Sequence, residues 1–247
     1  MGNNINRIKK RMLKIKGFGF GLLFYQLYLL SVLSLFFSGG EEMDTQALVT
    51  QIVPGYTVMF SFFIMISIVI AFVKERDGGM VARIASTPLP INRYFIGKWI
   101  PFMLIVIIQI IVLFTFGVLV YDLPLGDPLS LIVLSFVLAF LSTSWGMAMA
   151  VLVKTENMGI ALTQIIALGG AMLGGLWMPL DMMPAFIQAT AKFLPQFWAL
   201  DGYKNILLEG GTIMDIWLSI LILLSFGLIG AIIAFVSYPR FLRQSKS

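Results

Sequence analysis

The 247-residue chain contains no cysteine and no histidine. The first absence excludes disulfides, thiol nucleophiles and thiolate metal sites, and the second removes the commonest metal ligand and general base. Charge is also scarce, at 12% of residues, against about 25% in soluble domains, while 59% of residues are hydrophobic. A water-soluble domain could not bury that much apolar surface. We therefore expect a membrane protein that is not an enzyme and binds no metal.

Six segments carry no Asp, Glu, Lys or Arg, and each is 20 to 25 residues long. A helix that crosses a bilayer needs roughly 17–25 residues. The alternating segments of about 10 residues that indicate a membrane β-barrel are absent. The sequence predicts an all-α integral membrane protein, one domain over residues 1–247, with six transmembrane helices at residues 18–37, 53–73, 99–121, 129–153, 158–178 and 216–238.

The charges between these spans predict the orientation of the chain. Fifteen of the 17 basic residues fall on one side of the six spans, and nine of the 12 acidic residues fall on the other. Short loops rich in Lys and Arg stay in the cytoplasm, so both termini are expected there. This topology accounts for the net charge of +5, and no nucleic-acid partner is expected.

The basic run at residues 7–16 precedes the first span. We expect it to bind anionic lipid headgroups, and a specific ligand is the alternative. A basic run before an apolar segment also fits a secretory signal peptide, cleaved near the small residues Ser38-Gly39-Gly40. Cleavage would leave five spans and an external N-terminus.

The segment Lys74–Lys98 holds seven of the 29 charges and separates the second and third spans. It is too short and too basic to cross a membrane, which makes it a compact docking element on the cytoplasmic side. Gly78-Gly79 is expected to end the second helix, and Met80–Ser86 to form a short interfacial helix with Arg83 facing water. An ordinary positive-inside loop is the alternative interpretation.

The external segment Pro179–Asp215 is long and not simply polar. Apolar residues at roughly helical spacing predict a short amphipathic helix at the membrane interface, in a re-entrant or amphipathic segment between the fifth and sixth spans. A lid over these two spans and an external gate are both compatible with this pattern. The expected gate residues are Pro179, Pro184, Phe193 and Pro195, the expected helix breakers Pro195, Gly202, Gly210 and Gly211, and the expected interfacial anchors Phe197, Trp198 and Tyr203.

The fifth span contains two glycine pairs, Gly169-Gly170 and Gly174-Gly175. Small residues at this spacing let helix backbones approach closely. Close packing is therefore the first interpretation, and a flexible helix beside a transport path is the second.

No G-x-x-x-x-G-K-[ST] sequence occurs, so the chain does not bind ATP through a P-loop.

The cytoplasmic segment resembles a known family. Glu75-Arg76 through Gly79, Arg83, Thr87-Pro88-Leu89 and Gly97-Lys98 resemble the loop of ABC-2-type transporter permeases. Val53-Pro54-Gly55 at the second span and Met178-Pro179-Leu180 with Met183-Pro184 after the fifth are also similar to those permeases. The resemblance covers roughly Ile52 to the C-terminus. The 15-residue segment Ser38–Ile52 departs from it, because drug-exporting members often carry a large external domain there.

The resemblance implies a multi-pass permease of the bacterial cell membrane that pairs with a second permease, identical or different. It implies no directly bound cofactor, because ATP and Mg would be bound by a separate ABC ATP-binding subunit. The short helix would dock into that ATPase and transmit its closure to the second and third spans. The residues matched to this coupling role are Glu75, Arg76, Gly79, Arg83, Thr87, Pro88 and Lys98.

A charge-free lumen between two protomers would be lined by aromatic, Met and polar uncharged side chains. The candidate path residues are Met59, Phe63, Gln164, Met172 and Trp177, for which lipid-facing or core positions are the alternative. Flexible thioethers and aromatics suit varied lipophilic cargo. We therefore expect the membrane subunit of an ABC exporter for a drug, antibiotic or lipid-like compound. A non-transporting interaction, immunity or sensor subunit and an ion-extruding permease are the alternatives.

Overall fold

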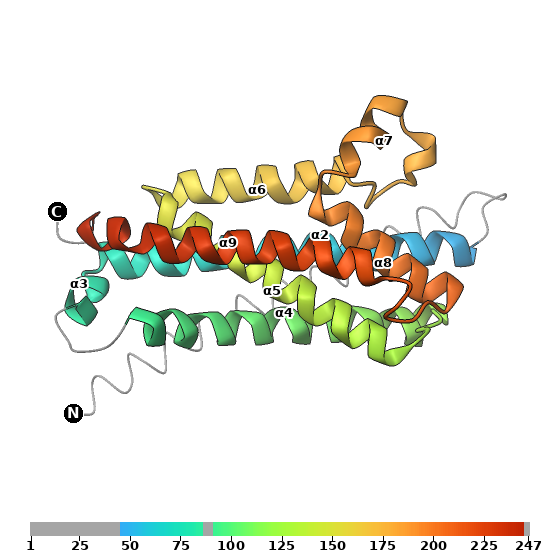
Figure 1. Cartoon of the computed structure of the whole chain (residues 1–247), viewed down its shortest axis with the longest axis horizontal. Coiled ribbons are helices and arrows are strands. Elements are labelled where there is room, and N and C mark those ends of the chain that lie inside the picture. Colours follow the sequence, from blue (N-terminus) through green and yellow to red (C-terminus); the bar gives the residue numbers. More distant parts are fainter. Residues whose placement is uncertain (1–44, 86–90, 245–247) are drawn as a thin grey trace. The chain divides into compact units, whose positions relative to one another are not determined.

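The computed structural model describes residues 45–85 and 91–244. The predicted first span, residues 18–37, lies outside this part of the chain, as do Thr87 and Pro88. Contacts divide the chain into two units, Met1–Leu48 and Val49–Ser247, and the helices described below belong to the second apart from residues 45–48 of the first helix. Within the described residues every regular element is a helix (Figure 1).

Five helices are long and apolar enough to cross a membrane, and they overlap the predicted second to sixth spans. They are α2 (Thr45–Asp77), α4 (Ile91–Tyr121), α5 (Pro128–Leu152), α6 (Glu156–Leu173) and α9 (Trp217–Gln244). Helix α6 ends at Leu173, before the predicted fifth span does, and Gly174 caps it. The connecting elements are α3 (Met80–Ala85), η1 (Leu180–Met182), α7 (Ala185–Ala191) and α8 (Pro195–Glu209).

Local capping fixes where the central helices begin. The carboxylate of Asp127 accepts a hydrogen bond from the backbone N–H of Ser130 at 2.9 Å, and Pro128 occupies the first turn of α5. The hydroxyl of Thr155 accepts from the backbone N–H of Met158 at 3.3 Å and caps α6. Both are residue types preferred at these positions, so short-range chemistry sets the α4–α5 and α5–α6 junctions.

Helices α2 and α5 are the most enclosed of the five, with 72% and 67% of their most apolar stretches buried. The corresponding fractions for α4, α6 and α9 are 33%, 28% and 33%. Their outward faces are apolar, for example at Leu119 on α4 and Val236 on α9, which are 78% and 73% exposed. Lipid tails are as apolar as leucine, so such faces need no protein cover in a bilayer.

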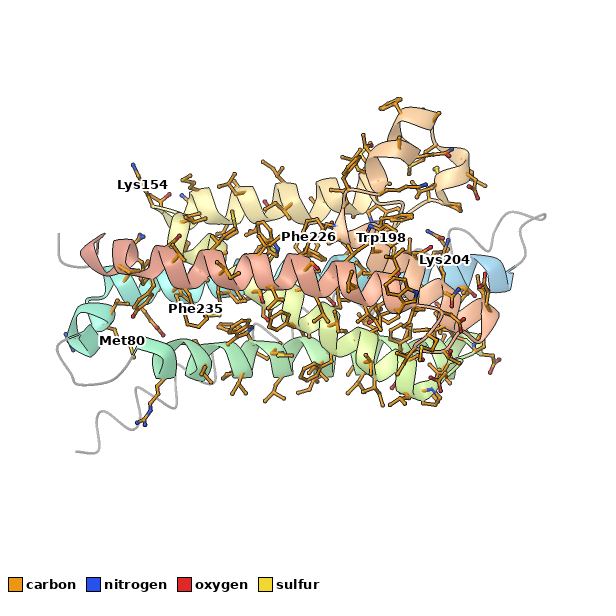
Figure 2. The ribbon with its side chains drawn as sticks, viewed as in Figure 1. Met80, Lys154, Trp198, Lys204, Phe226 and Phe235 are labelled. Carbon is orange, nitrogen blue, oxygen red and sulfur yellow. The ribbon has the colours of Figure 1, made fainter. Side chains whose placement is uncertain are left out.

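Helix α5 packs closely against α9, and glycines on α9 let the two backbones approach. A methyl group at Gly227 would lie 2.7 Å from the ring of Phe140, and one at Gly230 would lie 3.0 Å from Trp145. The indole N–H of Trp145 donates to the carbonyl of Phe226 at 3.0 Å, and Phe226 is labelled on α9 in Figure 2. Helix α4 also packs on α5, so α5 lies between α4 and α9 as the central element of this group.

Candidate functional site

The C-terminal end of α2 meets several other helices through charged side chains. The carboxylate of Glu75 accepts a hydrogen bond from the ammonium group of Lys98 on α4. The ammonium group of Lys74, the preceding residue, lies 3.4 Å from the carboxylate of Glu156 in the first turn of α6. The first pair brings together two residues of the predicted coupling set. The second was not predicted, since nothing in the sequence places Glu156 beside Lys74.

Arg76, also in the predicted set, is 7% exposed. Its guanidinium group donates to the carbonyl oxygens of Val153 and Lys154, between the end of α5 and the start of α6, with the first contact at 3.0 Å. Its Nε donates to Asp77 at 3.0 Å, and its Cζ lies 5.8 Å from the ring centroid of Phe241 on α9. A buried charge is stable only when paired and hydrogen-bonded, and Arg76 meets that condition.

Helix α3 follows α2 directly and forms the short helix that the sequence predicts. Gly79 separates the two with φ +67°, a backbone conformation that favours glycine. Helix α3 packs on α9, and Val81 on α3 is buried, at 1% exposure. Arg83 is exposed, and Met80 is 45% exposed at the start of the helix (Figure 2). Helix α3 therefore exposes the side chains of Arg83 and Met80, while its contact with α9 holds it in place.

The candidate path residues fall into two groups. The indole N–H of Trp177 donates to the sulfur of Met59 at 3.2 Å, which joins the segment after α6 to α2, and Phe63 lies half-buried one turn along α2. Gln164 and Met172 are exposed on α6 and contribute to a different surface. The structure therefore brings Met59 and Trp177 together, and it leaves Gln164 and Met172 open to lipid or to another protein chain.

Two buried glutamines near the end of α6 were not singled out in the sequence. The amide of Gln51 on α2 donates to the carbonyl of Gly175 at 2.7 Å, and the amide of Gln196 on α8 donates to the carbonyl of Ile166 at 3.2 Å. The side-chain oxygen of each has no partner among the described residues. A glutamine beside a long apolar run is the sequence signal that could have identified Gln51, because polar groups there need partners.

The predicted gate residues organise the segment between α6 and α9. Pro179 precedes η1, Pro184 precedes α7, and Pro195 is the first residue of α8, so each proline marks the start of a new element. Phe193, between α7 and α8, is 79% exposed. Helix α7 contacts η1 and α6, and it stands clear of α8 and α9 in Figure 1. The segment carries an exposed apolar surface at the end of the unit remote from α3.

Two expectations for this segment were wrong. Gly202 does not break a helix, because α8 runs through it and its missing side chain makes room for Leu134 of α5, 2.9 Å from where a Cβ would lie. Tyr203 is not an interfacial anchor. It is fully buried, its hydroxyl is 2.9 Å from that of Ser135, and its ring is 5.1 Å from that of Phe114. Burial raises the pKa of Tyr203, so its hydroxyl stays protonated as a hydrogen-bonding group.

The exposed side of α8 carries a small charged cluster. Partial burial raises the pKa of Asp201, and the ammonium group of Lys204 opposes that rise. Partial burial lowers the pKa of Lys204, and Asp181 and Asp201 oppose that fall (Figure 2). Opposite charges here oppose the effect of desolvation, and the charged groups come from both α8 and η1.

Several apolar helices able to cross a bilayer, tied together at one end by ion pairs, define a multi-pass membrane protein. Residues 40–236 match the family model described as ABC-2 family transporter protein. The chain therefore belongs to the ABC-2 transporter family, and the resemblance seen in the sequence is confirmed.

Relatives with known names agree. The chain is 26% identical over 199 residues to the linearmycin resistance permease protein LnrN of Bacillus subtilis (strain 168), covering 81% of this chain and 48% of that protein. It is 30% identical over 184 residues to YvfS of the same organism, named as a transport permease, covering 72% and 69%. It is 24% identical over 171 residues to YbhR of Escherichia coli (strain K12), named as a probable multidrug ABC transporter permease, covering 68% and 46%. The chain thus spans about half the length of the first and third relatives.

Proposed function

We propose that the chain is the membrane-spanning permease subunit of an ATP-driven exporter and moves a lipophilic or amphipathic compound outward. Membership of the ABC-2 transporter family is the observation that carries this proposal. The buried side chains of Tyr203, Ser135 and Arg76 make hydrogen bonds within the fold, which suits a structural role in a transport subunit.

ATP hydrolysis in this proposal belongs to a separate subunit, which binds ATP and Mg. The 247-residue sequence contains no P-loop, and a separate ATP-binding subunit is the proposed source of energy. Helix α3 is the proposed docking element, because it is short, carries the exposed Arg83 and is joined to α2 through a glycine break. Ion pairs such as Glu75–Lys98 connect the end of α2 to α4.

The proposed topology has six spans in one ABC-2 domain of a bacterial cell membrane, with both termini in the cytoplasm. The charge distribution supports it, since 15 of 17 basic residues fall on the side that carries α3. A second permease, identical or different, completes the transport unit. The exposed residues Gln164 and Met172 on α6 are available to such a partner.

The proposed cargo follows from the lining chemistry and from the names of the relatives. Met59 and Trp177 form a polarizable contact that tolerates varied apolar shapes. One relative is named for linearmycin resistance and another as a multidrug permease. An antibiotic-like, drug-like or lipid-like amphipath is therefore the proposed cargo class, and efflux of such a compound would confer resistance.

A pull-down from the native host in mild detergent, with ATP hydrolysis assayed on the eluate, tests the proposal. We expect an ATPase to co-purify with the wild-type chain and to be lost from a Glu75→Ala/Arg83→Ala double variant. Lys192→Ala is the matched control, because Lys192 is an exposed cation at the other end of the unit. A chain that elutes without associated hydrolysis in all three forms would favour a non-transporting membrane protein.

A further inference from the structure

Arg76, near the C-terminal end of α2, contacts the α5–α6 junction and α9. Each guanidinium nitrogen is hydrogen-bonded: Nε to Asp77, and the two terminal nitrogens to the carbonyls of Val153 and Lys154. The group is 7% exposed and stacks near Phe241. The planar guanidinium group has N–H donors on both terminal nitrogens, so it can bind two successive carbonyl oxygens at once. A lysine ammonium group cannot do this with the same geometry.

The two acceptors lie at a break in the backbone. Val153 ends α5 in an extended conformation, with φ −78° and ψ 145°, and Thr155 caps the start of α6 in another. Carbonyls at a helix C-terminus carry partial negative charge, so a guanidinium is favoured there. Arg76 therefore joins the end of α2 to the junction of the next two helices rather than to either helix alone.

A neighbouring contact provides the comparison. Lys74 and Glu156 also connect α2 to α6, but their side chains are 65% and 34% exposed. Water and salt screen the attraction within such a pair, and exposed ion pairs contribute little to the stability of a protein. Loss of Arg76, by contrast, would leave two carbonyls without their buried donor. Further along, α6 lies close against α2, since a methyl group at Gly159 would sit 2.2 Å from Val69.

We propose that Arg76 is a positioning residue that fastens the end of α2 to the α5–α6 junction, so that a displacement of α3 moves α6 together with α2. This inference rests on the proposed function, in which α3 receives the motion of an ATPase. Glu75 and Lys98 would carry the same displacement to α4. Arg76 thereby links the docking helix to α6, the helix whose outer face bears Gln164 and Met172, at the α5–α6 junction.

The first test needs neither ATPase nor cargo. The chain has no cysteine, so spin labels at Met80→Cys on α3 and Asn157→Cys on α6 report one distance, and both positions are exposed. In nanodiscs we expect a single narrow distance distribution for the parent and for Lys74→Gln. Arg76→Gln is expected to broaden it. Arg76→Lys keeps the positive charge and serves as a second variant in case Arg76→Gln does not fold. We expect it to broaden the distance distribution as well. A distribution of parental width in both Arg76 variants would overturn the inference.

The second test separates positioning from stability and uses the co-purified ATPase complex. A reference label at Met214→Cys, 80% exposed and far along the chain from α3, is paired with Met80→Cys or with Asn157→Cys. Addition of ATP, Mg and vanadate is expected to shift both distances in the parent and in Lys74→Gln. In Arg76→Gln we expect the α3 distance to shift and the α6 shift to be lost. Loss of both shifts, or of neither, would contradict the role given to Arg76. If neither distance shifts with nucleotide in the parent protein, the result contradicts the proposed function and not the role of Arg76. The distance distributions of the first test then decide whether Arg76 positions α6.

Discussion

At the scale of single residues, backbone conformation and small polar contacts decide where helices stop and how they meet. Gly79 has φ +67°, and a Cβ there would meet no atom within 4 Å. A side chain at this position would therefore clash with nothing, and its only cost would be the unfavourable backbone conformation. L-residues in the left-handed region are less favourable by roughly 1–2 kcal/mol. The break between α2 and α3 depends on this one residue more than on any side-chain contact.

Gly79→Ala is expected to lower the stability of the chain by roughly 1–2 kcal/mol. The measurement is the apparent Tm in detergent. Gly97→Ala is the matched control, because Gly97 lies within α4 and its added methyl also meets no atom within 4 Å. Alanine is favoured over glycine inside a helix by about 0.5–1 kcal/mol, so the control should be neutral or stabilising. Equal losses for the two variants would contradict this account of Gly79.

The buried contact between Tyr203 and Ser135 gives a second prediction at this scale. Tyr203→Phe and Ser135→Ala each remove one side of a 2.9 Å hydrogen bond and should each lower stability by about 1 kcal/mol. Removing both should cost less than the sum of the two, because no unpaired group remains. Chemical denaturation of the four forms of this cycle checks the result. Strictly additive losses would show that the hydroxyls do not interact.

At the scale of elements, packing between spans depends on close backbone approach. A methyl group at Gly55 of α2 would lie 2.1 Å from the carbonyl oxygen of Leu176, which belongs to backbone and cannot rotate away. Gly55→Ala is expected to destabilise the chain by roughly 1–3 kcal/mol and to separate α2 from the end of α6. Gly169→Ala is the control, since nothing lies within 4 Å of its added methyl. Thermal unfolding should distinguish the two, and similar melting temperatures would contradict the packing described.

The elements also show how far the sequence alone could go. Helix α3 was predictable because Gly78-Gly79 is a local signal, and the described spans were predictable because their charge-free runs match a bilayer in length. Tyr203 was mispredicted because an amphipathic residue suits both an interface and a buried hydrogen bond. Only the position of Ser135, far away in the sequence, decides between them. The acceptors of Arg76 are backbone carbonyls, which carry no sequence signal at all.

At the scale of the whole molecule, the two ends of the Val49–Ser247 unit should face opposite compartments. Because the chain lacks cysteine, a single introduced thiol reports its own side of the membrane. Phe193→Cys is expected to react with a membrane-impermeant maleimide added to intact cells. Lys154→Cys, at the exposed α5–α6 junction, should react only after the cells are opened (Figure 2). The reverse pattern would invert the proposed orientation.

The central claim is that α3 binds a separate ATPase. The most direct measurement is site-specific crosslinking in membranes of the native host, with a benzophenone attached at Arg83→Cys on α3 or at Phe193→Cys between α7 and α8. We predict that the probe on α3 captures a protein that contains a P-loop, identified by mass spectrometry, and that the probe at Phe193 does not. Capture of no such protein from α3, or its equal capture from both positions, would contradict the assignment of this chain as an ATP-driven permease coupled through α3.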